Sequence, residues 1–203
     1  MIGIIDYGLG NINAFCNVYK RLNIPAVTVQ TPAQLAECSH LILPGVGAFD
    51  DAMKRLDTSG LWEPLEKRVL NDSIPVLGIC VGMQMLAESS EEGVLPGLRW
   101  IPGKVRRFDP ETIKGKPKLP HMGWNNVEMN NIPLFKNVEQ NSRFYFIHSY
   151  YFAPEHPENL IASSFYGIPF ASAINRGRIF GIQFHPEKSH HAGIMVLKNF
   201  AEL

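Results

Sequence analysis

Gly78-Ile-Cys-Val-Gly-Met83 decides the fold of this chain, because it places Cys80 where a strand has to turn sharply into a helix. The segment before it, Ile74–Leu77, is mostly apolar and β-prone, and Val81–Glu88 has helix-forming content. The two glycines of the stretch occupy positions where a side chain would clash in a tight turn. This pattern matches the nucleophile elbow G-x-S-x-G with sulfur in place of oxygen, which exposes a nucleophile at the C-terminal edge of a sheet.

The surroundings of Cys80 favour a reactive thiol. The helix after the elbow aims its N-terminus, the positive end of its dipole, at the cysteine, and this favours thiolate over thiol. A buried structural cysteine at a strand end is the alternative, since free cysteine behaves as a small hydrophobic residue. The elbow pattern alone leaves both interpretations open.

A second stretch, Gly181-Ile-Gln-Phe-His-Pro-Glu-Lys-Ser189, contains the two partners that a thiol nucleophile needs. We expect Ile179–Phe184 to be a buried strand, with His185 and Glu187 at its C-terminal end. Residues i and i+2 of an extended segment point to the same side, and Pro186 favours an extended conformation at His185. The imidazole and the carboxylate would then form a general base and its orienting group. A surface loop is the alternative, but the elbow cysteine favours catalysis.

Both stretches are similar to motifs of the class I, or triad, glutamine amidotransferases. Cys80, His185 and Glu187 fall on that family's catalytic positions one by one, and the resemblance covers essentially the whole chain. Within the family, further segments resemble the glutaminase subunits of imidazole glycerol phosphate synthases. These segments are Asp6-Tyr-Gly-Leu-Gly-Asn11, Pro44-Gly-Val-Gly-Ala-Phe49, Pro120-His-Met-Gly-Trp-Asn125 and Tyr145-Phe-Ile-His-Ser-Tyr150.

The resemblance implies an activity and a partner. The chain is expected to hydrolyse L-glutamine to glutamate and ammonia through a cysteinyl thioester, without a cofactor or a metal. Ammonia would pass through an internal channel to a cyclase subunit with a (β/α)8 barrel, so that the two chains form a heterodimer. The cyclase would make imidazole glycerol phosphate and aminoimidazole carboxamide ribonucleotide, in histidine biosynthesis.

The reaction also needs hydrogen-bond donors for the oxyanion that forms on the substrate. One is expected to be the backbone N–H of Val81, the residue after the nucleophile. The resemblance implies that the glycine-bearing turn after the third strand contributes as well, through Val46 and Gly47. It further implies that four residues hold the glutamine, namely Gln84, Glu92, Ser149 and Tyr150.

An apolar surface patch is expected to mark the docking site of the cyclase. The Met-Gly-Trp segment at 122–124 would reduce solubility unless a partner covers it. The predicted interface residues are Met122, Trp124, Asn125, Tyr145 and Lys188.

Two other functions stay open at the level of the sequence. The chain could serve another class I synthase, such as anthranilate, guanylate or pyridoxal phosphate synthase, although the Met-Gly-Trp-Asn segment argues against these. It could also be a non-catalytic regulatory module on the same scaffold. Such a module is expected to have lost a triad residue, whereas this chain retains all three.

The order of elements predicts one domain over residues 1–203 with a three-layer α/β/α architecture. Strands alternate with helices in the first half, which implies a mostly parallel sheet covered on both faces, and the C-terminal half adds antiparallel strands. Apolar residues at helical spacing predict a helix over Ile12–Leu22 and a closing helix whose apolar residues, from Ile194 to Phe200, face inward. Pro110–Pro120 is expected to be a surface loop. The predicted strands are Ile2–Ile5, Ala26–Val29, Leu41–Leu43, Pro75–Ile79, Leu98–Phe108, Asn125–Glu128, Phe144–Phe152, Leu160–Ser164, Ala171–Asn175 and Ile179–Phe184.

The composition agrees with a compact cytoplasmic enzyme. With 45% hydrophobic residues among 203, the chain can bury a sizeable core. Its formal net charge of zero gives no reason to expect a nucleic-acid or membrane-surface partner. A strand directly after Met1 is expected to leave no room for a signal peptide, and the apolar runs are too short to cross a bilayer. Cys16 and Cys38 are expected to be reduced and structural.

Three other features have simpler explanations than a functional site. Gly8-Leu-Gly10 resembles the start of a phosphate loop, but Asn13 breaks the G-x-G-x-x-G pattern, so a close backbone turn near a partner surface is favoured. Adjacent His190 and His191 point apart on a helix and do not predict a metal site. His148 lies on an apolar strand, which favours a hydrogen-bonded structural histidine over an alternative base.

Overall fold

The apolar segments of the first half form neighbouring parallel strands, as their sequences predict. The computed structural model describes residues 1–114, 118–140 and 142–203, and in this part of the chain an eight-stranded sheet has the order β2-β1-β3-β4-β13-β12-β11-β8. The strands from β2 to β13 are parallel, while β12, β11 and β8 each pair antiparallel with the strand before them in this order. These strands are β1 (Ile2–Ile5), β2 (Ala26–Val29), β3 (His40–Gly45), β4 (Val76–Cys80), β8 (Glu128–Met129), β11 (Leu160–Tyr166), β12 (Ile168–Arg176) and β13 (Ile179–Ile182).

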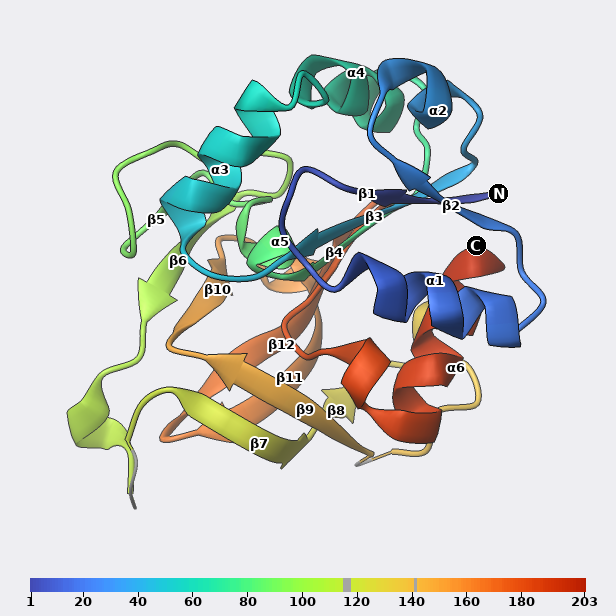
Figure 1. Ribbon diagram of the computed structural model, residues 1–203. Helices are drawn as coiled ribbons and strands as arrows, with labels where there is room; N and C mark the ends of the chain where they lie inside the picture. The colour runs from blue at the N-terminus through green and yellow to red at the C-terminus, as the bar shows by residue number, and fades with distance from the viewer. Residues whose placement is uncertain (115–117, 141) are drawn as a thin grey trace.

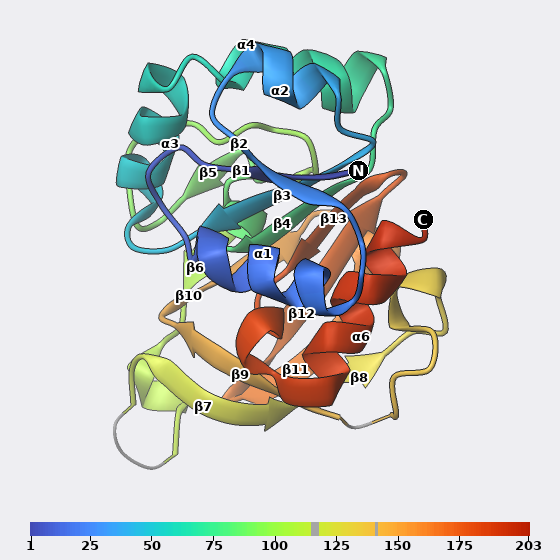
Figure 2. The same cartoon turned by 45° about the vertical axis from the view of Figure 1, so that its right-hand side comes forward.

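Helices cover both faces of this sheet, so the molecule has three layers (Figure 1 and Figure 2). One face carries α2 (Pro32–Ala36), α3 (Phe49–Thr58) and α4 (Trp62–Glu66). The other face carries α1 (Ile12–Arg21) and α6 (His190–Ala201). The predicted α/β/α fold with added antiparallel strands is confirmed.

The helices α1 and α6 bury their apolar residues against the sheet, with one departure from the prediction. Tyr19 of α1 is fully buried, and so are Leu197 and Phe200 of α6. Ile194 stays partly exposed, and Val196 lies in the core instead.

The helix after the elbow is shorter than predicted. The helix α5 spans Val81–Gln84 and does not reach Glu88. The carbonyl groups of residues 85–87 accept hydrogen bonds from the N–H groups of Leu98, Arg99 and Ile101, so they are not available to a further helical turn. The same hydrogen bonds keep residues 98–101 from pairing with a neighbouring strand. The strand predicted over Leu98–Phe108 is therefore wrong in its first part, and β6 spans Gly103–Arg107.

Two other predicted strands each divide between two sheets. The strand predicted over Phe144–Phe152 breaks at Ser149, and the strand predicted over Asn125–Glu128 breaks at Val127. Each predicted strand is therefore replaced by two shorter strands. One of the two joins a two-stranded ribbon, and the other joins either the main sheet or a small three-stranded sheet. The ribbon consists of β7 (His121–Asn126) and β9 (Arg143–His148), and the small sheet consists of β10 (Tyr150–Pro154), β6 and β5 (Ser89–Ser90).

Short helical turns connect these elements. The loop predicted over Pro110–Pro120 begins with one of them, and its residues 115–117 lie outside the described part of the chain. No helix within the described residues is long and apolar enough to cross a bilayer. The turns are η1 (Lys67–Asn71), η2 (Pro110–Thr112), η3 (Pro133–Phe135), η4 (Pro157–Asn159) and η5 (Pro186–Lys188).

Candidate active site

The strand β4 runs directly into α5 at Cys80, which confirms the predicted elbow. Cys80 has φ +56° and ψ −114°, a backbone conformation that residues other than glycine rarely adopt and that is found at functional sites. A Cβ atom on Gly78 would lie 2.5 Å from the carbonyl oxygen of Gly82, and one on Gly82 would overlap the carbonyl group of Leu43. The two glycines therefore allow the backbone contacts that hold the cysteine in this conformation.

His185 and Glu187 lie together, as expected for a base and its orienting group. The Nδ1 atom of His185 lies 3.0 Å from Oε1 of Glu187, and the two side chains are only 5% and 3% exposed. A carboxylate accepts, so Nδ1 carries the hydrogen and Nε2 is left as the basic nitrogen. Nε2 is buried and has no well-formed hydrogen bond within the described residues, which leaves it available to the thiol.

Electrostatic contacts set the proton affinity of His185. Burial lowers its pKa, but the interactions with Cys80 and Glu187 outweigh burial and raise the pKa above its ordinary value. A ring with a raised pKa holds a proton more firmly. The arrangement therefore favours transfer of the thiol proton from Cys80 to His185.

The backbone around His185 is fixed by neighbouring elements. His185 has an extended conformation, as predicted, but η5 follows it at once, so the turn rather than an extended segment brings Glu187 back to the ring. The N–H of His185 donates to the carbonyl of Tyr145 at 2.9 Å. The hydroxyl of Ser189 donates to the carbonyl of His185 at 2.6 Å and accepts the N–H of Tyr145 at 3.0 Å.

Three neighbouring parallel strands deliver the candidate residues to one edge of the sheet. Gly45 at the end of β3 pairs in register with Cys80, and Ile79 pairs with Ile182 at the end of β13. A cavity of about 300 Å³ opens at this edge. Its lining residues are Val46, Gly47, Cys80, Val81, Gln84, Glu92, Ile147, His148, Ser149, Tyr150, His185 and Lys188.

The candidate oxyanion donors lie on two sides of the cavity. Val81 is the first residue of α5, where a backbone N–H has no acceptor within the helix. Val46 is 39% exposed, and Gly47 has φ +87° with open space where a side chain would start. Their positions fit the predicted role, which stays a prediction.

All four candidate glutamine-binding residues line this cavity, but they differ in how far the protein already uses them. The Nε2 atom of Gln84 donates to the carbonyl of Tyr150 at 3.1 Å and to Oε1 of Gln183 at 3.0 Å. Glu92 accepts the N–H of Phe49 at 2.9 Å, and burial raises the pKa of its carboxyl group. Gln84 therefore shapes the wall of the cavity, whereas Glu92 adds a carboxylate to it.

The structure adds one residue that the sequence prediction missed. Gln183 is fully buried, and its Nε2 atom donates to Sγ of Cys80 at 3.7 Å. The same side chain accepts from Gln84, so it links the nucleophile to the cavity wall. An amide within the otherwise apolar run Ile179–Phe184 was the available signal.

His148 is a structural histidine, as predicted, although it also lines the cavity. Its Nδ1 atom donates to the carbonyl of Tyr150 at 2.7 Å, so its Nε2 atom must accept from Nδ1 of His121 at 2.9 Å. The amide of Asn125 lies 3.3 Å from Nε2 of His121 and completes the chain of hydrogen bonds. Burial lowers the pKa of His148 to about 3, so this ring is a poor base.

Most of the predicted interface residues lie together on the β7–β9 ribbon. Trp124 pairs with Tyr145, and Met122 pairs with Ile147, so these four side chains share one side of the ribbon. We call this set the apolar face; Met122, Trp124 and Ile147 are 57%, 36% and 40% exposed. Lys188 adjoins it, with Nζ 5.5 Å from the centre of the Tyr145 ring.

Asn125 does not share the orientation of the apolar face. Its Nδ2 atom donates to the carbonyl of Phe165 at 2.9 Å and lies beside His121, on the opposite side of β7 from Trp124. The side chain is therefore used inside this chain. No group of three or more His, Cys, Asp or Glu side chains in the described part of the chain could hold a metal ion.

Comparison with known proteins agrees with this geometry. A family model described as glutamine amidotransferase class-I matches residues 3–202. Over 206 aligned residues, the chain is 55% identical to the imidazole glycerol phosphate synthase subunit HisH of Bdellovibrio bacteriovorus. It is 50% identical over 204 residues to the subunit of the same name from Leptospira interrogans, and both alignments cover 100% of each protein.

Solved structures of low sequence identity share the fold. A crystal structure of a glutamine amidotransferase aligns with a TM-score of 0.75 and 21% identity, covering 100% of this chain and 99% of that one. The structure of PurLQS from Thermotoga maritima aligns with a TM-score of 0.68 and 16% identity, covering 99% and 97%. The elbow, the triad and these similarities together show that the chain belongs to the class I glutamine amidotransferases.

Proposed function

We propose that the chain is the glutaminase subunit of an imidazole glycerol phosphate synthase, which acts in histidine biosynthesis. The presence of Cys80 and His185 at one cavity, with Glu187 bonded to the His185 ring, is the observation that carries the glutaminase reaction. The similarity to HisH subunits over the full length supports this particular synthase. Retention of all three triad residues argues against a non-catalytic module.

The reaction begins with transfer of a proton from Cys80 to His185. A free cysteine thiol has a pKa of about 8.5, so only a few per cent is thiolate at neutral pH. Nε2 of His185 takes the proton, and Glu187 holds the ring and stabilises the imidazolium. The thiolate sulfur then attacks the side-chain amide carbon of glutamine.

The tetrahedral intermediate that follows carries a negative oxygen. The N–H of Val81 and an N–H of the turn at Val46 and Gly47 bind this oxygen. His185 gives its proton to the departing nitrogen, the carbon–nitrogen bond breaks, and ammonia leaves a glutamyl thioester on Cys80. Water, deprotonated by the same ring, attacks the thioester and releases glutamate and the thiolate.

Charge arguments assign the ends of the substrate. Glu92 is the carboxylate among the described cavity-lining residues, so it binds the α-ammonium group of glutamine. Ser149 and Tyr150 lie at the break between β9 and β10 and contact the rest of the amino-acid moiety. Near the reacting amide, Gln183 holds Cys80 through its hydrogen bond to Sγ, and Gln84 in turn holds Gln183.

A cyclase subunit receives the ammonia. Ammonia released into water would be protonated and would lose its nucleophilicity, so a partner has to cover the exit. The apolar face borders the cavity through Ile147, and an exposed apolar surface of this kind is typical of protein interfaces. We assign it to the contact with a (β/α)8-barrel cyclase, together with Lys188. A cytoplasmic location fits this pathway.

The function is tested by mixing the chain with the cyclase subunit and its nucleotide substrate. We expect a stable heterodimer that forms imidazole glycerol phosphate from glutamine. Support of anthranilate or guanylate synthesis instead would assign the chain to another synthase.

The partner surface is tested by Trp124→Ala. Trp124 stacks on His190 with a ring-centre distance of 4.9 Å but is exposed, so the fold should persist. We expect the dissociation constant for the cyclase to rise about tenfold or more, as for a central interface aromatic residue. Phe165→Ala is a matched control, because Phe165 is 65% exposed and lies outside the apolar face. Equal binding by Trp124→Ala and the parent chain would contradict the assignment.

A further inference from the structure

We infer that Tyr7 is a positioning residue for glutamine hydrolysis, because its hydroxyl group fixes the base of the turn Pro44–Gly47 against the nucleophile elbow. The inference rests on the proposed glutaminase function. Tyr7 belongs to the segment Asp6–Asn11, which the mechanism above does not use.

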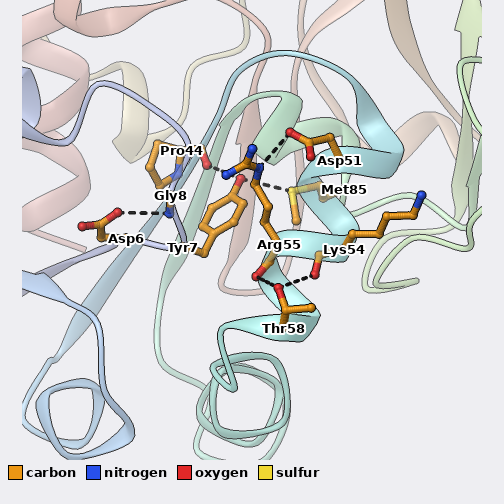
Figure 3. A network of polar contacts seen from close by, with 9 residues as sticks. All are labelled: Asp6, Tyr7, Gly8, Pro44, Asp51, Lys54, Arg55, Thr58 and Met85. Carbon is orange, nitrogen blue, oxygen red and sulfur yellow. Dashed lines mark hydrogen bonds and ion pairs between the residues drawn. The ribbon is translucent and has the colours of Figure 1, made fainter.

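The hydroxyl group of Tyr7 contacts two segments that meet at the cavity. Tyr7 is 5% exposed, and its hydroxyl donates to the carbonyl of Pro44 at 2.7 Å. The same oxygen lies 3.5 Å from Sδ of Met85 (Figure 3). A hydroxyl has one proton to give and a thioether is a weak acceptor, so the carbonyl takes it and the sulfur is a secondary contact. The hydroxyl therefore joins the end of β3 to the segment after α5.

The bond to Pro44 fixes the first peptide group of the turn. A peptide group is planar, so a fixed Pro44 carbonyl also fixes the plane that contains the N–H of Gly45. On its other side Gly45 packs against the elbow, since a Cβ atom there would lie 2.9 Å from the carbonyl carbon of Val81. The base of the turn is held between Tyr7 and the elbow, whereas Val46 and Gly47 beyond it are open to solvent.

The loop after β1 is itself fixed, so Tyr7 can act as an anchor. The carboxylate of Asp6 accepts the N–H of Gly8 at 3.1 Å and Nε2 of Gln30 at 2.7 Å. The N–H of Asp6 donates to the carbonyl of Val29 at 2.9 Å. These bonds tie the loop to the end of β2. Figure 3 shows the Tyr7 ring beside α3, with its oxygen directed toward Pro44 and Met85.

Burial keeps the hydroxyl protonated. Burial raises the pKa of Tyr7, and the charges of Cys80 and Asp51 raise it further. The group is thus a permanent donor rather than a participant in proton transfer. Tyr7 is not among the described residues that line the cavity, and it acts through the Pro44 peptide.

Tyr19 offers a matched control for removal of this hydroxyl. Tyr19 is also buried, and its hydroxyl donates to a backbone carbonyl, that of Leu197, at 3.1 Å. This bond joins α1 to α6, on the other layer of the molecule. Tyr7→Phe and Tyr19→Phe therefore remove the same atom and the same kind of bond, but only the first lies beside the turn.

The experiment measures glutamine hydrolysis by the complex with the cyclase and its nucleotide. We expect kcat of Tyr7→Phe to fall about tenfold, a fraction of the hundred- to thousandfold loss when an oxyanion donor is removed outright, with KM unchanged within twofold. Tyr19→Phe should keep kcat within twofold. Incorporation of 3-fluorotyrosine at position 7, which retains the hydroxyl, should keep the parent kcat.

Two reagents directed at Cys80 distinguish an effect on the oxyanion turn from an effect on the reactivity of the thiol. A glutamine-derived aldehyde adds the thiol to its carbonyl carbon and places the resulting oxygen at the oxyanion donors, so its inhibition constant should rise by the same factor as kcat falls. Iodoacetamide alkylates the sulfur with loss of iodide and forms no oxyanion, so its rate should not change. A purely structural role would not separate these two readouts.

The outcomes distinguish this inference from the proposed function. A parent complex without glutaminase activity would overturn the proposed function. An active parent with an unchanged Tyr7→Phe kcat, an equal loss in Tyr19→Phe, or a parallel loss of iodoacetamide reactivity would overturn the role of Tyr7 alone. So would failure of Tyr7→Phe to fold, because the hydroxyl would then serve folding rather than the turn.

Discussion

The triad and the oxyanion turn follow neighbouring strands of one sheet but are built in opposite ways. His185 and Glu187 are buried and hydrogen-bonded to each other, and the backbone of His185 is bonded on both sides. Val46 and Gly47 are open to solvent, and a glycine conformation ends the turn. The molecule thus places a fixed candidate nucleophile and base beside an adaptable turn.

The largest expected effect on activity comes from removing the fixed nucleophile, Cys80. Cys80→Ala should abolish glutamine hydrolysis but leave ammonia-dependent synthesis by the complex intact, because only ammonia production needs the thiol. Both activities are measured on the same preparation, and Cys16→Ala serves as a control far from the cavity. Loss of both activities in a folded Cys80→Ala complex would contradict the assignment of the thiol to ammonia production alone.

A labelling experiment completes this prediction. A glutamine-analogue electrophile should modify Cys80 and spare Cys16 and Cys38, since only Cys80 lines the cavity among the described cysteines. Peptide mass spectrometry locates the label. Label spread over all three cysteines would show that the elbow does not activate the thiol.

The next effect separates the base from its orienting group. His185→Ala should lower kcat by about a hundred- to ten-thousandfold, because no proton acceptor is left. Glu187→Gln should cost less than His185→Ala, because the base remains and only its orientation and tautomer are no longer fixed. Steady-state kinetics on both variants checks the order. Equal or reversed losses would mean that the roles are assigned wrongly.

The adaptable turn at Val46 and Gly47 predicts that the isolated chain has low glutaminase activity. Glycines on both sides of Val46 make a peptide rotation there inexpensive, so the isolated chain can hold a donor in the wrong direction. We expect its glutaminase activity to be about a hundred- to thousandfold below that of the nucleotide-loaded complex. The partner and nucleotide can correct the turn only by their differential affinity for the active state. Equal rates for the chain alone and the loaded complex would show a preformed site.

The smallest effect concerns the buried pair His121 and His148, of which His148 lines the cavity. Burial lowers the pKa of His121 to about 4 and that of His148 to about 3. Both folded values lie below the ordinary 6.5, so the unfolded chain binds protons first, and the stability is present above about pH 6.5 and lost as pH falls. The raised pKa of His185 acts oppositely, with stability present below about pH 6.5 and lost as pH rises through the folded value.

This prediction is checked by urea unfolding between pH 7 and pH 5. The midpoint should fall with pH in the parent chain and fall less in His148→Gln. His156→Gln, a change at an exposed histidine, should retain the parent pH dependence. A parent midpoint that does not change over this range would refute the neutral pair.

The parallel half of the fold could be predicted almost residue by residue, because its strands are short apolar runs separated by helices. Ile2–Ile5 and Ala26–Val29 have the predicted bounds. The C-terminal half was less predictable, since Ser149 and Val127 redirect the chain between sheets without a glycine or proline to mark the break. The short α5 could not be foreseen either, because its limit is set by hydrogen bonds from residues 98–101.

The candidate site likewise divides into residues that local sequence predicts and residues that only distant contacts place. The positions of Cys80, His185 and Glu187 near the ends of two strands could be predicted, because each residue belongs to a local motif. Gln183 and Tyr7 escaped prediction, because their contacts with Cys80 and Pro44 join segments far apart in the sequence. Local patterns reveal a nucleophile and its base, whereas the groups that support them are fixed only by tertiary packing.

The positive φ of Cys80 places catalysis and folding in conflict. A non-glycine residue in such a conformation costs about 1–3 kcal/mol, more than the roughly 0.5–1 kcal/mol of extra chain entropy that a glycine would lose there. A glycine at this position would relieve that backbone strain, but it would remove the nucleophile and the buried sulfur that Gln183 contacts. The conformation that presents the thiol to the cavity is thus held against the backbone preference of the residue that carries it.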